Sequence, residues 1–97
     1  MNEEKKTNYE HALEEYIRAR KDLAHLQAEY DKNRHGMRVQ LYAEKAAGAK
    51  YTEEQIRSTT ITKFADLGTN VILAQADLDN ATAILNFYRD LYNKENN

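Results

Sequence analysis

Few side chains in this 97-residue sequence have the types and spacing that catalysis or metal binding requires. Its three histidines, His11, His25 and His35, are too far apart to form the i, i+4 pair of a helical zinc site. Asp22 with His25 matches one element of a helical di-iron site, but such a site needs carboxylates from four helices. The chain has no cysteine, no glycine-rich phosphate loop and a single serine, Ser58. We therefore expect no metal, no cofactor and no enzymatic activity.

A cluster of cations and aromatic rings in the middle of the chain has the composition of a site for single-stranded nucleic acid. Residues 32–51 carry five basic side chains and only one acidic side chain, Glu44. Tyr42 and Tyr51 are interleaved with these cations. Aromatic rings stack on bases while cations bind phosphates. The predicted nucleic-acid contacts are Arg34, Arg38, Tyr42, Lys45 and Lys50.

Two simpler interpretations of the same residues stay open. Tyr51 precedes a helix start and can form a hydrophobic staple with Ile56, and Tyr42 can fill a core position. The basic run can also be an ordinary solvated helix face. The chain as a whole has a net charge of −2, and its C-terminal half is acidic, which argues against coating nucleic acid non-specifically.

The composition favours long helices as the elements that position these residues. There is no proline, there are only three glycines, and charged residues make up 31% of the chain. A pair of long helices buries little apolar surface by itself, so we expect self-association into a homo-oligomer. No stretch approaches the roughly 20 apolar residues of a membrane span, and no leader peptide is recognisable. Together with the absence of cysteine, this predicts a cytoplasmic protein without a membrane partner.

The first helix is predicted over about residues 7–47. Gly36 weakens this helix without ending it, and Gly48 is suited to a left-handed C-terminal cap. The helix presents an apolar seam whose spacings alternate between three and four residues, which is typical of a helix packed lengthwise on another. The seam consists of Tyr9, Ala12, Tyr16, Ala19, Leu23, Leu26 and Tyr30.

The second helix is predicted over about residues 52–93, after a connection at 48–51. Thr52 and Gln55 form a capping box, the most specific local pattern in the chain. Residues 59–70 include poor helix formers and Gly68, so the sequence leaves open whether the helix is continuous there. Beyond residue 63 an apolar seam again alternates between three and four. Its predicted oligomer contacts are Phe64, Leu67, Val71, Leu78, Leu85, Tyr88 and Tyr92.

The apolar surface of the second helix is broader than one antiparallel partner would cover. Ile72, Ile84, Phe87 and Leu91 lie outside the seam, which indicates that more than two helices meet. The predicted fold class is all-α: a long helical hairpin with coiled-coil-like packing, forming one domain over residues 1–97 and assembling into an oligomer.

Two segments carry a resemblance to a known family. The run from Lys50 to Ile56, followed by the Ala74, Leu78, Ala81 and Leu85 pattern, resembles small helical proteins encoded by tailed phages. Some of these resemble the phage recombination mediator, an oligomeric helical protein that binds single-stranded DNA and loads a recombinase. The resemblance covers about the last half of the chain. It implies DNA contact through Arg34, Arg38, Lys45 and Lys50 and assembly through the C-terminal seam.

Two functional hypotheses follow. The first is a non-enzymatic oligomeric accessory protein of phage DNA recombination or replication, with single-stranded DNA and a recombinase or another replication protein as partners. The alternative is a phage or prophage adaptor or inhibitor that acts purely by protein–protein contact through a helical face. Neither hypothesis involves a small-molecule substrate.

Overall fold

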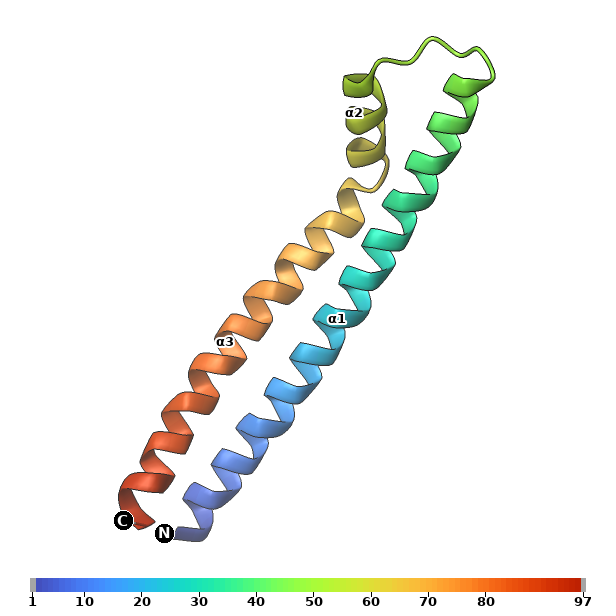
Figure 1. Ribbon diagram of the computed structural model, residues 1–97. Helices are drawn as coiled ribbons and strands as arrows, with labels where there is room; N and C mark the ends of the chain where they lie inside the picture. The colour runs from blue at the N-terminus through green and yellow to red at the C-terminus, as the bar shows by residue number, and fades with distance from the viewer. Residues whose placement is uncertain (1, 97) are drawn as a thin grey trace. The chain divides into compact units, whose positions relative to one another are not determined.

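The computed structural model describes residues 2–96 and contains three helices within that range. They are α1 (Asn2–Ala46), α2 (Glu53–Lys63) and α3 (Ala65–Asn96), and no strand occurs among the described residues. Figure 1 shows α1 followed by a return segment made of α2 and α3, which confirms the predicted all-α helical hairpin. The chain divides into two compact units. We call Met1–Ala24 with Ile72–Asn97 the terminal unit, and His25–Val71 the bend unit.

The terminal unit pairs the first half of α1 with most of α3, side by side and antiparallel (Figure 1). Near the chain ends, Lys5 forms an ion pair with Glu95, and the rings of Tyr9 and Tyr92 lie 5.4 Å apart. Small side chains between the helices let the two backbones approach closely. The buried apolar residues of this unit are Ala12, Ala19, Ala74 and Leu85.

The bend unit packs the second half of α1 against α2 and the first residues of α3. Leu41, Ile56 and Thr60 are its buried side chains. Tyr30 lies directly against the α3 backbone at Gly68, where a Cβ atom would come within 3.2 Å of the Tyr30 hydroxyl oxygen. A glycine at this position therefore leaves the space that the tyrosine ring uses.

Both ends of the connection between α1 and α2 follow from local sequence. Gly48 has a φ of 117°, and the amides of Gly48 and Ala49 donate to the carbonyls of Lys45 and Glu44, which forms a Schellman motif. The predicted capping box at Thr52 is confirmed. The Thr52 hydroxyl accepts from the Gln55 amide at 3.1 Å, and the Gln55 side chain accepts from the Thr52 amide at 2.9 Å.

The return segment is interrupted at a single residue, Phe64, whose φ and ψ of −111° and 26° separate α2 from α3. Residues 58–62 of α2 are all β-branched or hydroxylated, and the Thr60 hydroxyl donates to the Ile56 carbonyl at 2.8 Å. Such residues weaken a helix through lost side-chain freedom and competing hydrogen bonds.

The first helix also begins earlier than predicted, at Asn2, because Glu3 and Glu4 in its first turn oppose the helix dipole.

Candidate nucleic-acid and protein interfaces

The structure places most of the predicted nucleic-acid contacts on one side of α1. Arg34, Arg38 and Tyr42 follow each other at intervals of four residues, so they line one stripe of the helix, and Lys45 continues it. Lys50 lies beyond the end of α1, in the connection to α2, and is exposed. All five residues belong to the bend unit, and we call them the basic stripe.

The acidic first turn of α2 meets this stripe. The Tyr42 hydroxyl donates a hydrogen bond to Glu53, and the Lys45 Nζ lies 3.5 Å from Glu53 Oε1. The hydrogen bond from Tyr42, aided by the charge of Lys45, lowers the pKa of Glu53. The same hydrogen bond raises the pKa of Tyr42, because ionising the phenol would place two negative charges together. The Glu53 carboxylate thus binds two members of the basic stripe, Tyr42 and Lys45.

Two further members differ in what they contact. The guanidinium of Arg34 is half-buried and lies 5.0 Å from the centroid of the Tyr30 ring, a cation–π arrangement. Arg38 is exposed and forms no ion pair within residues 2–96. It borders two shallow grooves, one shared with Tyr42 and Glu53 and one of about 260 Å³ shared with Arg34. Arg38 and Lys50 are therefore the members most accessible to a phosphate.

Tyr51, the second aromatic residue near these cations, packs in the way the simpler interpretation predicts. It is half-buried beside the capping box, and Ile56 at the matching staple position is buried. Its hydroxyl donates to Glu44 at 3.1 Å, which raises the pKa of Tyr51. Its ring is thus less available for stacking on a base than the ring of Tyr42, which is exposed.

Sequence reasoning missed the part that Glu53 plays. The capping pattern correctly placed Glu53 in the first turn of a helix, where it opposes the helix dipole. It did not indicate that the turn would lie against the basic stripe, because that contact depends on the path of the connection. The sequence hints at this pairing in that the basic run of residues 32–51 directly precedes the acidic first turn of the helix.

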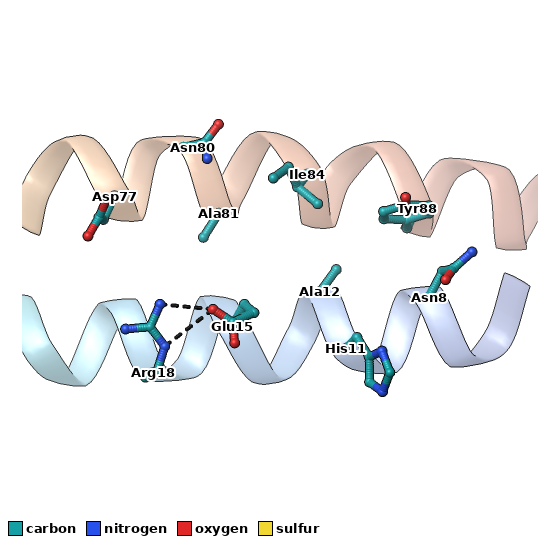
Figure 2. Close-up of a pocket in the computed structure, with 10 residues that line it drawn as sticks. All are labelled: Asn8, His11, Ala12, Glu15, Arg18, Asp77, Asn80, Ala81, Ile84 and Tyr88. Carbon is teal, nitrogen blue, oxygen red and sulfur yellow. Dashed lines mark hydrogen bonds and ion pairs between the residues drawn. The ribbon is translucent and has the colours of Figure 1, made fainter.

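The terminal unit has a different kind of surface, a groove of about 320 Å³ between α1 and α3. Figure 2 shows Ala12 and Ala81 both pointing into the space between the two helices, with Ile84 and Tyr88 following along α3. Apart from Ala12, the α1 wall of the groove is polar. Its polar lining residues are Asn8, His11, Glu15 and Arg18, with Arg18 bonded to Glu15 at 2.8 Å.

Large apolar side chains are exposed on both helices of the terminal unit. The most exposed are Ile72 at 70%, Leu73 at 59% and Phe87 at 58%, and the remaining ones are Leu13, Ile17 and Ile84. The seam residues predicted as oligomer contacts are instead buried or half-buried within the chain. They are Phe64, Leu67, Val71, Leu78, Leu85, Tyr88 and Tyr92. Their part in an oligomer stays a prediction.

Comparison with known proteins adds no relative. No family model matches the chain, and no curated protein or solved structure matches it significantly. Among residues 2–96, no group of three or more potential ligands is placed to hold a metal ion. None of the described helices combines the length and the apolar character needed to cross a membrane.

Proposed function

We propose that this protein is a non-enzymatic helical adaptor that acts by protein–protein contact through its terminal unit. The observation that carries the proposal is the distribution of apolar side chains there. Three of the four buried apolar residues are alanines, whereas six large apolar side chains are exposed. Where such side chains form a contiguous patch rimmed by polar residues, they are typical of protein–protein interaction sites.

The exposed side chains of the terminal unit form two surfaces. Ile84 lines the groove, together with Glu15 and Arg18 of α1. Leu13 and Ile17 lie on the other side of α1 from these two residues, because each residue turns the helix by about 100°. An adaptor with two apolar surfaces can hold two protein partners at once. The resemblance described above suggests a phage or prophage origin and a cytoplasmic site of action.

Photo-crosslinking in living cells tests this proposal. A photoreactive residue at position 17 should form a covalent adduct with another protein, because Ile17 lies in the proposed contact surface. The same residue at position 22 is the matched control, since Asp22 is an exposed residue of the same helix on the other side from Ile17. Equal labelling at both positions, or no adduct at position 17, would overturn the proposal for this face.

A second candidate function is binding of single-stranded DNA as part of a recombination or replication assembly that contains a recombinase. The observation that favours it is the accessible part of the basic stripe, where Arg38 and Lys50 are exposed and the Tyr42 ring borders the same groove as Arg38. An oligomer would display several such stripes, so weak contacts would add up along one strand.

Fluorescence anisotropy with labelled oligo-dT tests the second candidate. Binding should weaken steeply as salt rises, because phosphate contacts release counterions. The double variant Arg38→Ala/Lys50→Ala should lose most of the binding. Arg20→Ala/Lys21→Ala removes the same two charges from exposed positions of the terminal unit and should bind normally. No binding at low salt would exclude this candidate and leave the adaptor proposal untouched.

A further inference from the structure

We infer that the groove side of α3 docks, in antiparallel orientation, onto the same surface of a second copy of this chain. The surface is a row of six side chains on α3, which we call the outer row. Its members are Leu73, Asp77, Asn80, Ile84, Phe87 and Leu91. The inference rests on the proposed function, since it names the first partner of the terminal unit.

The spacing of the outer row is that of a helix packed lengthwise on another helix. Its members are separated by four, three, four, three and four residues, the repeat that keeps one stripe of a helix facing a partner. α3 already uses a different stripe with the same repeat against α1. In that inner stripe Ala74 and Leu85 are buried, whereas Leu73, Ile84 and Phe87 of the outer row are exposed. α3 therefore has two packing surfaces, of which one is covered within the chain.

The groove gives the second helix a place to lie. Asp77, Asn80 and Ile84 of the outer row line it from α3. Figure 2 shows Arg18 on the α1 wall of the groove, where it is bonded to Glu15. A partner helix along the outer row would cover Ile84 and Phe87 and leave the polar α1 wall at the edge. That arrangement is an apolar centre with a polar rim.

The small core of the terminal unit points to a permanent partner, because a chain with little buried apolar surface usually needs oligomerisation to be stable. The few buried side chains of the terminal unit, mostly alanines, supply little core of their own. A partner needed for stability must be present whenever the chain is made, and a second copy meets that condition.

The order of residues in the outer row favours the antiparallel orientation. The row is symmetric in spacing about residue 82, so a two-fold axis there pairs Leu73 with Leu91 of the second copy. The same axis pairs Asp77 with Phe87 and Asn80 with Ile84. Two parallel copies in register would place Asp77 directly against Asp77 of the second copy. The antiparallel arrangement separates these carboxylates by ten residues, about 15 Å along the helix, and so avoids the repulsion of like charges.

Light scattering with size-exclusion chromatography tests the surface. The molar mass that light scattering measures for the eluted wild-type protein should be twice the chain mass of 11.3 kDa. Phe87→Glu should raise the dimer dissociation constant by roughly 30-fold or more, as the loss of an aromatic side chain buried in an interface does. Ile72→Glu is the matched control, because Ile72 is more exposed than Phe87 on the same helix but lies outside the outer row. This variant should stay dimeric.

Disulfide trapping tests the orientation without relying on a disruptive variant. The chain has no cysteine, so each introduced thiol is unique. Mixed Leu73→Cys and Leu91→Cys chains should give a crosslink between the two variants on oxidation. Each variant alone should crosslink poorly, because the antiparallel pairing keeps identical positions apart.

The possible results separate this inference from the proposed function. A wild-type chain that is monomeric at tens of micromolar, or a dimer that Ile72→Glu breaks as readily as Phe87→Glu, would overturn the outer row as a self-docking surface. Crosslinks of Leu73→Cys only with itself would overturn the antiparallel orientation. A monomer that still forms a position-17 adduct with another protein would leave the adaptor proposal standing without this inference.

Discussion

The bend unit and the terminal unit are both built from antiparallel helices, but they differ in which helices their polar side-chain pairs connect. In the bend unit, polar side chains from different elements meet: Glu53 of α2 contacts Tyr42 and Lys45 of α1, and Tyr51 contacts Glu44. In the terminal unit, the polar pairs of Arg18 run along one helix, to Glu15 and to Asp22, whereas the ion pair of Lys5 with Glu95 joins the two helices.

Charge follows the same division. The bend unit has seven basic and six acidic side chains, a net charge of +1, and the terminal unit has seven and ten, a net charge of −3. The bend unit also buries larger apolar side chains, Leu41 and Ile56, where the terminal unit buries mainly alanine. The bend unit exposes three large apolar or aromatic side chains, Val39, Tyr42 and Ile61, whereas the terminal unit exposes six.

The largest expected effect in the bend unit is at Ile56, which is 3% exposed. Ile56→Ala should lower the free energy of unfolding by about 2–5 kcal/mol, because it removes buried methyl groups and leaves a cavity. Ile61→Ala is the control in the same helix, since Ile61 is 47% exposed, and it should change stability by less than about 0.5 kcal/mol. Urea denaturation followed by circular dichroism measures both. Equal effects would show that the bend unit has no core of its own.

A smaller effect is expected where Tyr30 lies against Gly68. Gly68→Val should cost about 1–3 kcal/mol of stability, because its side chain would overlap the tyrosine ring. Gly36→Val is the matched control within the bend unit, since a Cβ atom at Gly36 meets nothing within 4 Å. This control should keep or slightly raise stability, because valine forms helix better than glycine. In a Tyr30→Ala background the cost of Gly68→Val should shrink, and an unchanged cost would exclude the proposed overlap.

Features set by neighbouring residues could be predicted from the sequence, and features set by distant ones could not. The capping box at Thr52 and the cap at Gly48 depend on atoms a few residues apart, so the sequence contains their full cause. The interruption at Phe64 lies inside the segment where the sequence left continuity open. The residue at which the helix breaks could not be predicted, because weak helix formers extend over several positions there.

The candidate sites show the same limit more strongly. Spacing alone placed Arg34, Arg38 and Tyr42 on one stripe of a helix. It did not indicate that Glu53 would lie against that stripe, since the pairing joins two elements across a connection. The inner seam was recognised from its apolar spacing. The outer row was not predicted as a row, because Asp77 and Asn80 interrupt its apolar pattern, although Ile84, Phe87 and Leu91 were placed outside the seam.

The smallest expected effect tests the polar closure of the bend unit through the Tyr42–Glu53 hydrogen bond. The raised pKa of Tyr42 means that its contribution to stability is complete below the ordinary value of 10.0 and is lost as pH rises through the folded-state pKa. The lowered pKa of Glu53 means that its contribution is present above the ordinary value of 4.5 and is lost as pH falls through the folded-state pKa. The pair therefore stabilises the bend unit between these two limits.

Glu53→Gln should move the pKa of Tyr42 back toward 10.0, because the acceptor no longer carries a charge. Nuclear magnetic resonance titration of carbon-labelled tyrosine measures this shift, and Tyr42→Phe assigns the signal. Glu44→Gln is the matched control, since it should act on Tyr51 and leave Tyr42 unchanged. The same Glu53→Gln chain should bind oligo-dT more tightly if the basic stripe contacts DNA, because Lys45 loses its carboxylate partner. A Tyr42 pKa that does not respond would show that the bend unit does not close its basic stripe through Glu53, and the contrast between the two units would then rest on their apolar side chains alone.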